Sequence, residues 1–184
     1  MTTLHVFVTG PNGSGKTQLL QSLGDPDGFW RDDEAGLEYR HLVVDATLEV
    51  YLFCSVDASR FDHLLDIPQR DLLGYIVMVD STDTETWSEA RVMLANCRGY
   101  ALLPMLIAAN KQDLPGAYSA EQVGAWLGMG TMMKVQPCVA TDAESARSVL
   151  LQLLYSVEHE IDRLDALIAE LERLAAESAE NPDS

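Results

Sequence analysis

Residues 10–17 of this 184-residue chain read GPNGSGKT, and this octapeptide constrains the fold more than any other segment. It follows the short apolar run LHVFV (4–8) and precedes TQLLQSLG (17–24), whose apolar residues have helical spacing. The octapeptide satisfies the Walker A pattern, G-x-x-x-x-G-K-[ST], between a strand and a helix. The motif therefore predicts a phosphate-binding P-loop rather than an ordinary glycine-rich turn.

The chemistry expected of this loop follows from its residue types. Glycines let backbone N–H groups curl around phosphate oxygens, and Lys16 offers a positive charge to the outer phosphates. The Thr17 hydroxyl is the predicted metal ligand, for Mg²⁺. The residues predicted to hold the phosphates are Asn12, Gly13, Ser14, Gly15, Lys16 and Thr17.

Expected strands and helices alternate along the rest of the chain. Strands are expected at 38–46, 48–54, 72–80, 102–109 and 134–140, and helices at 84–98 and 119–127. With the strand at 4–8 this makes six strands, of which 38–46 and 48–54 are close enough in sequence to pair antiparallel. The order predicts an α/β P-loop fold with a mostly parallel six-stranded sheet, helices on both faces, and ligands at the carboxyl ends of the strands.

The composition indicates one domain and narrows the classes of partner. A chain of 184 residues with 47% apolar residues is large enough to bury a core. The formal net charge of −17 argues against nucleic-acid binding and against a polybasic membrane surface, since both need clustered Lys and Arg.

Cys54, Cys97 and Cys138 lack metal-ligand spacing, and we find no membrane span, signal peptide or prenylation box. We expect a cytoplasmic protein.

A second motif, NKQD, follows the strand expected at 102–109. A carboxylate at Asp113 can accept hydrogen bonds from two guanine N–H groups, whereas adenine offers the wrong pattern. The motif therefore predicts recognition of guanine. The residues expected to contact the base are Asn110, Lys111 and Asp113, together with the backbone N–H groups of Ala140 and Thr141 after the last strand.

These motifs resemble those of the Ras-like small GTPases, and in the middle of the chain the Arf branch is most similar. The resemblance covers about residues 4–158 and is carried by GPNGSGKT, VDSTDTETWSEAR (79–91), NKQDLPGAYSAEQV (110–123) and PCVATD (137–142). The chain is also similar to bacterial Ras-like GTPases that work beside small roadblock-type proteins. The resemblance implies that GTP or GDP binds with Mg²⁺, and that the protein regulates a protein partner.

The chain departs from this family where the family senses the γ-phosphate. Family members carry Asp-x-x-Gly at the end of the third strand, usually followed by a water-positioning Gln, whereas this chain has Cys54, Asp57 and Ala58. A neutral thiol is a poor magnesium ligand, a carboxylate repels phosphate, and a methyl group does not orient water. The family's switch threonine also has no counterpart, because residues 23–46 contain neither Thr nor Ser.

This departure leaves two main hypotheses open. The first is a GTPase with slow or partner-dependent hydrolysis, in which one of several acids replaces the missing magnesium ligand: Asp32, Asp33, Glu34 or Asp57. The second is a pseudo-GTPase scaffold that acts through its surfaces and its C-terminal helix. A P-loop ATPase or kinase is a third alternative, which the NKQD motif disfavours. The catalytic residues are left unassigned.

The segment 143–180 contains neither Gly nor Pro and predicts one long helix. Its apolar residues recur at alternating spacings of four and three, the pattern of a heptad seam. This seam consists of Leu150, Leu154, Val157, Ile161, Leu164, Ile168, Leu171 and Ala175. It predicts either packing against the chain's own domain or a helix-mediated dimer or hetero-complex. We divide the chain into a Ras-like G domain (1–156), a helical extension (157–178) and a disordered tail (179–184).

Overall fold

The computed structural model describes residues 2–43, 46–57, 71–128 and 133–180. Its strands are β1 (Thr2–Thr9), β2 (Phe29–Asp32), β3 (Leu37–Val43), β4 (Leu48–Ser55), β5 (Leu72–Asp80), β6 (Met105–Asn110) and β7 (Lys134–Pro137). Its helices are α1 (Lys16–Ser22), α2 (Trp87–Tyr100), α3 (Ala120–Leu127) and α4 (Ala143–Glu180), with short 3-10 turns η1 (Pro26–Gly28) and η4 (Thr84–Thr86). Every predicted strand and helix is present, in the predicted order.

The strands form a single mostly parallel sheet in the order β2-β3-β4-β1-β5-β6-β7. β1 pairs parallel with β4 and β5, and β6 pairs parallel with β5 and β7. The predicted antiparallel pair is confirmed as β3 and β4. The predicted number of strands is too low by one, because the described residues contain seven. The additional strand, β2, pairs antiparallel with β3 at the sheet edge, where Trp30 stacks on Tyr39 at 5.3 Å between ring centroids.

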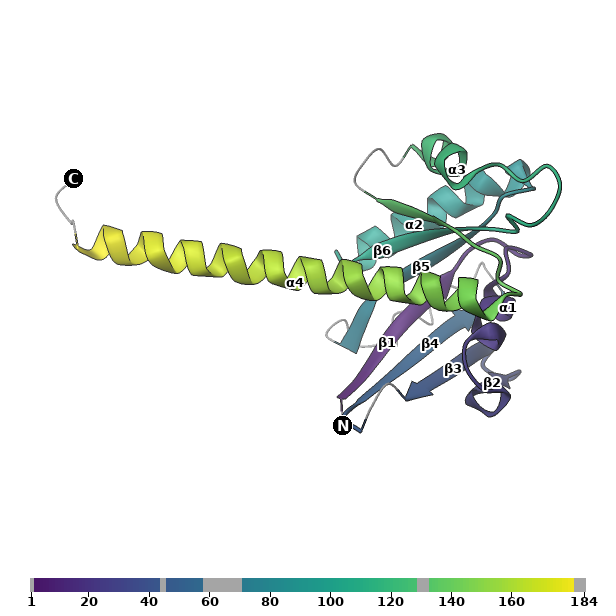
Figure 1. Cartoon of the computed structure of the whole chain (residues 1–184), viewed down its shortest axis with the longest axis horizontal. Coiled ribbons are helices and arrows are strands. Elements are labelled where there is room, and N and C mark those ends of the chain that lie inside the picture. The colour runs from purple at the N-terminus through teal and green to yellow at the C-terminus, as the bar shows by residue number, and fades with distance from the viewer. Residues whose placement is uncertain (1, 44–45, 58–70, 129–132, 181–184) are drawn as a thin grey trace.

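Helices cover both faces of the sheet, as predicted (Figure 1). Alternate residues of β5 show the two layers. Ile76 and Met78 belong to the core cluster shared with α1 and α4, whereas Val77 and Val79 pack with α2 and α3. This burial on both faces explains why the β5 sequence is a continuous apolar run.

Helix α1 is held at its C-terminal end by a buried arginine. Arg40 of β3 is fully buried, and its guanidinium donates to the backbone oxygens of Leu20 at 2.6 Å, Gln21 at 2.9 Å and Asp25. These carbonyls lie at the end of the helix or just after it, where backbone oxygens have no N–H donor within the helix. Arg40 thus fixes the helix that begins at the predicted phosphate-binding loop.

Helix α4 is one continuous helix over Ala143–Glu180, which confirms the predicted long helix. Its first turns pack on the sheet through buried residues such as Val149 and Leu153. Farther along, Ile161 is 52% exposed, Leu164 47% and Ile168 52%, and Figure 1 shows the helix projecting away from the sheet. Among the seam residues whose side chains are described, packing on the domain is therefore confined to the first half of the helix. The side chains of Leu171 and Ala175 lie outside the described part of the structure.

None of the helices among the described residues combines the length and the apolar character needed to cross a membrane.

Candidate nucleotide-binding site

The predicted site lies where four parallel strands end. The P-loop follows β1, Asp80 ends β5, the NKQD segment follows β6, and the segment 138–141 follows β7. Because parallel strands present their carboxyl ends at the same edge of a sheet, the topology brings these segments together.

Two glycines allow the P-loop to approach its neighbours closely. Gly10 has φ 146°, and a Cβ there would lie 2.3 Å from the backbone oxygen of Met78. Gly15 has φ 102°, and a Cβ there would lie 2.2 Å from Nδ2 of Asn110. Any larger residue would displace the loop from β5 or from the NKQD segment, so the glycines determine where the loop lies.

The interior of the loop offers donors to an anion. Lys16 is buried and donates from Nζ to the backbone oxygens of Gly10 at 2.8 Å and Pro11 at 3.1 Å. Burial lowers the pKa of its ammonium group, and nearby negative charges oppose this shift only in part. The buried Ser14 hydroxyl has no hydrogen-bond partner among the described residues. An ammonium group bonded only to neutral carbonyls and an unpaired hydroxyl are donors that suit phosphate oxygens.

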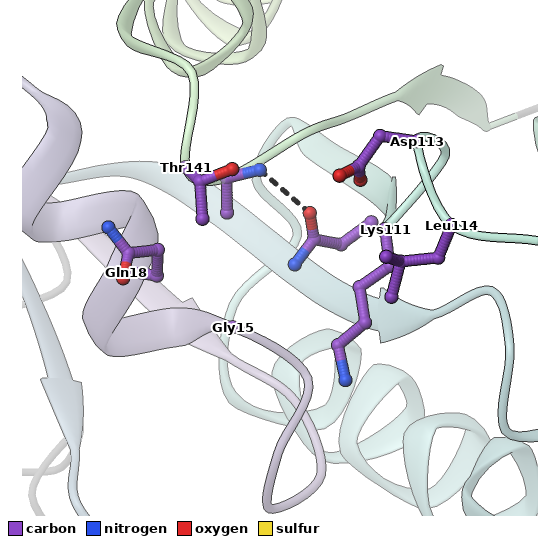
Figure 2. A pocket seen from close by; sticks show the side chains of 8 residues that line it. Gly15, Gln18, Lys111, Asp113, Leu114 and Thr141 are labelled. Carbon is purple, nitrogen blue, oxygen red and sulfur yellow. Dashed lines mark hydrogen bonds between the residues drawn. The ribbon is translucent and has the colours of Figure 1, made fainter.

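Asn110 joins the three site segments. Its buried side chain donates from Nδ2 to the backbone oxygen of Ser14 at 2.8 Å, and its Oδ1 accepts from the backbone N–H of Ala140 at 2.8 Å. The second of these bonds is dashed in Figure 2. Asn110 therefore orients the site, and the Ala140 N–H that sequence reasoning assigned to the base is engaged by Asn110.

Lys111 has an uncommon backbone conformation, with φ 65° in the left-handed region. Its Nζ forms an ion pair with Asp80 Oδ2, while Asp80 Oδ1 accepts from the backbone N–H of Thr82 at 2.9 Å and from its hydroxyl at 2.7 Å. Burial by itself would raise the pKa of the Asp80 carboxyl, but the hydrogen bonds from Lys111 and Thr82 outweigh it and lower the pKa. Asp80 therefore anchors Lys111 as a carboxylate.

The segments line an open cavity of about 260 Å³. Figure 2 shows the Asp113 carboxylate directed over this cavity toward Thr141, with the Lys111 stem along one side. Sequence reasoning missed Gln18 and Leu114, because they lie just outside the two motifs and carry no signal of their own. The lining residues are Gly15, Gln18, Asn110, Lys111, Asp113, Leu114, Ala140 and Thr141, which brings together six of the predicted site residues.

Thr17, the predicted metal ligand, contacts a carboxylate that the sequence analysis did not single out. Its Oγ1 donates to Oε2 of Glu38 at 2.5 Å, and Cys54 Sγ donates to the same oxygen at 3.5 Å. Burial raises the pKa of the Cys54 thiol, and the nearby Glu38 carboxylate raises it further, so Cys54 is a neutral thiol. Glu38 is only 1% exposed, which makes it a buried acid next to the P-loop.

The acids that sequence reasoning considered as substitutes are placed differently. Asp32 Oδ1 accepts from the backbone N–H groups of Glu34 and Ala35, and Asp33 pairs with Arg31 at 2.7 Å. Asp57 is exposed, and its charge is close enough to Lys16 to affect the pKa of that group. Ala58 lies outside the described residues.

Comparison with known proteins agrees with these motifs. The family model described as the ADP-ribosylation factor family matches residues 68–161, about half of the chain. ADP-ribosylation factor-like protein 4D of Mus musculus is 31% identical over 153 residues, which cover 76% of this chain and 75% of that protein. ADP-ribosylation factor-like protein 3 of Chlamydomonas reinhardtii is 27% identical over 144 residues, which cover 74% of this chain and 80% of that protein.

Proposed function

This chain belongs to the ADP-ribosylation factor family of Ras-like small GTPases, and from this premise we propose that it binds GDP and GTP and acts as a cytoplasmic regulatory protein. One observation carries the proposal. The buried Asn110 side chain hydrogen-bonds both the P-loop and the segment after β7, and these segments line a cavity together with Asp113.

Separate groups of site residues are proposed to bind the phosphates and the base. Backbone N–H groups of residues 12–17 and the Lys16 ammonium hold the phosphates, because the loop concentrates donors at the start of α1. Asp113 selects guanine through its two carboxylate oxygens, and the Thr141 N–H adds a contact to the base. Asn110 and Lys111 keep these groups in place.

Mg²⁺ fits the oxygen groups beside the P-loop, namely the Thr17 hydroxyl and the Glu38 carboxylate. When bound, the ion supplies positive charge that balances the nucleotide phosphates. Thr17 is the residue proposed to hold it.

Hydrolysis is proposed to be slow without a partner. The described switch segment ends in a buried neutral thiol, Cys54, and an exposed acid, Asp57, where the family carries a magnesium carboxylate and a phosphate-binding glycine. Without these contacts, the described residues of this segment offer few groups that distinguish GTP from GDP. A ligand shifts a conformational equilibrium only by its differential affinity for the two states, so we expect little rearrangement between the two nucleotide states.

A second function is favoured by the exposed part of α4. Ile161, Leu164 and Ile168 lie on one seam of a helix that projects from the domain, and each is about half exposed. Such a seam suits a helix-mediated dimer or a hetero-complex, with a roadblock-type protein as one candidate partner. On this alternative, the chain is a pseudo-GTPase scaffold whose nucleotide stabilises it without driving a switch.

Competitive binding of GDP and ADP tests the proposed function. The wild-type protein is expected to prefer GDP by at least about 100-fold, because ADP leaves the Asp113 carboxylate unpaired. Asp113→Asn should lose this preference, since an amide presents one acceptor in place of two. Glu121→Gln, which removes an exposed carboxylate from nearby α3, is the matched control and should keep it. Equal wild-type affinity for GDP and ADP contradicts the proposal.

A further inference from the structure

Glu38 and Cys54 face each other across two strands. They are directly paired residues of the antiparallel strands β3 and β4, and their side chains meet, with Cys54 Sγ 3.5 Å from Glu38 Oε2. The same oxygen accepts from Thr17 Oγ1 at 2.5 Å. Pairing across the sheet therefore puts a carboxylate beside the P-loop threonine, from the strand next to the one on which the family carries its aspartate.

Glu38 has positive charge nearby, from Arg31 and from the Lys16 ammonium, but among the described residues its oxygen Oε2 contacts only neutral donors. The side chain is 1% exposed, and a buried carboxylate is costly unless opposite charge and hydrogen bonds compensate it. Arg31 contacts only the other oxygen, Oε1, at 3.2 Å, and the Arg31 side chain is 46% exposed. Oε2 faces two neutral donors, the hydroxyl of Thr17 and the thiol of Cys54. A cation next to Thr17 would complete this arrangement.

We propose that Glu38 is the positioning carboxylate of the magnesium site and replaces, from the adjacent strand, the aspartate that is missing at Cys54. This inference rests on the proposed nucleotide binding. By accepting a hydrogen bond from the Thr17 hydroxyl, Glu38 leaves the oxygen lone pairs of Thr17 available to the metal, and its charge attracts the cation. Mg²⁺ is usually held by one or two carboxylates with several waters, which matches this donor set.

The other nearby acids are less suited to this role. Asp33 is 84% exposed and paired with Arg31, and Asp32 accepts hydrogen bonds within its own turn. Of the acids considered, Glu38 alone is both buried and hydrogen-bonded to Thr17. On this proposal the magnesium site keeps a carboxylate, which comes from β3 instead of β4.

The test compares GDP affinity in excess Mg²⁺ with GDP affinity in EDTA, by displacement of a fluorescent GDP analogue. The ratio of the two affinities measures the contribution of the metal. Glu38→Gln is expected to lower this ratio by about 10- to 100-fold, the usual effect of losing a group that orients a metal ligand. GDP affinity in EDTA should stay within about twofold, because the site without metal does not need the carboxylate.

Two further variants separate a metal role from a structural one. Glu38→Gln/Cys54→Asp returns a carboxylate from the neighbouring strand and should restore the ratio. Asp33→Asn removes the other partner of Arg31 and should leave the ratio at the wild-type value. Mn²⁺ affinity of the GDP complexes, measured by electron paramagnetic resonance, should follow the same order among the variants.

The outcomes distinguish this inference from the proposed function. An unchanged ratio in Glu38→Gln, with GDP still bound, overturns the role of Glu38 and leaves nucleotide binding standing. Absence of GDP binding by the wild-type protein in both conditions overturns both. If Glu38→Gln is too unstable to assay, Glu38→Asp decides: it keeps the charge but draws the carboxylate back from Thr17, so a lowered ratio supports the inference and a ratio at the wild-type value overturns it.

Discussion

The Asn110 side chain donates a hydrogen bond to the backbone oxygen of Ser14 at 2.8 Å, across 96 residues of sequence. Its other side-chain atom, Oδ1, accepts from Ala140 at 2.8 Å. One amide therefore fixes the distance between the loop that would hold phosphates and the segment that lines the cavity. The arrangement of the site therefore depends on these two hydrogen bonds of Asn110.

Asn110→Ala is expected to destabilise the fold and the site together. The substitution leaves a buried carbonyl and a buried N–H without partners, at a cost of about 2 to 4 kcal/mol in the free energy of unfolding. GDP affinity should fall by at least about tenfold, because the P-loop loses its fixed position. Denaturant unfolding and GDP titration measure the two effects. Gln136→Ala, which removes an exposed amide that bonds Ser148, should change neither.

Lys16→Ala should weaken binding of GDP and GTP by about 2 to 4 kcal/mol, since a charge-assisted contact to phosphate is lost. Binding of guanosine, which carries no phosphate, should change much less. Calorimetry with both ligands reports the difference. Lys134→Ala removes an exposed lysine of β7 and controls for the change in net charge. An equal loss for GDP and guanosine would show that Lys16 acts on the fold and not on the phosphates.

Asp80→Asn tests the ion pair with Lys111 through its pH dependence. The folded protein lowers the pKa of the Asp80 carboxyl, so its stabilising contribution is complete above the ordinary value of 3.8 and is lost as the pH falls through the folded value. We expect the variant to be less stable than wild type by about 1 to 3 kcal/mol at neutral pH, and the difference to shrink in acid.

Urea unfolding at a series of pH values between neutral and strongly acidic measures this difference. Asp162→Asn, on the exposed part of α4, serves as the carboxylate control and should differ little from wild type throughout. A stability difference for Asp80→Asn that is constant with pH would contradict an ionic role for the Asp80 carboxyl.

Deleting the residues after Val157 should leave the domain folded and its GDP affinity unchanged. The core residues of α4 end before this point, with Leu153 fully buried and Ile161 already half exposed. Leu153→Ala, by contrast, should cost about 2 to 5 kcal/mol of stability. Thermal melts compare the two variants, and sedimentation shows whether deletion removes any self-association. Unfolding of the truncated protein would mean that the projecting half of α4 belongs to the core.

The strands and helices that fill the core were predictable from sequence. β5 begins and ends at the predicted residues, because a nine-residue apolar run has few alternatives to a fully buried strand. α4 begins at the predicted residue and is continuous because no Gly or Pro interrupts it, but it reaches Glu180, two residues into the segment 179–184 that was expected to be disordered. The edge strand β2 was missed, since its four residues FWRD are too few to show a strand pattern, are mostly exposed, and form a strand by pairing with β3.

The site was predictable where it lies within contiguous motifs, and not where it depends on pairing between strands. The P-loop and the NKQD segment meet at the sheet edge, as parallel strand order requires. Glu38 has no motif of its own, and its closeness to Thr17 follows from the β3–β4 register, which sequence spacing does not define. The position of Asn110 was predicted, but its contacts to Ser14 and Ala140 required the structure.

The most direct test mixes the protein with equal concentrations of GTP and ATP in Mg²⁺, then measures the identity of the bound nucleotide over time. An ordinary small GTPase hydrolyses its bound GTP with a half-life of about 30 minutes when no partner helps. We predict that guanine nucleotide dominates the bound fraction and that most of it is still GTP several half-lives later. Bound ATP in amounts similar to GTP, or conversion to GDP within the ordinary half-life, would contradict the account of a guanine-nucleotide site with an impaired switch.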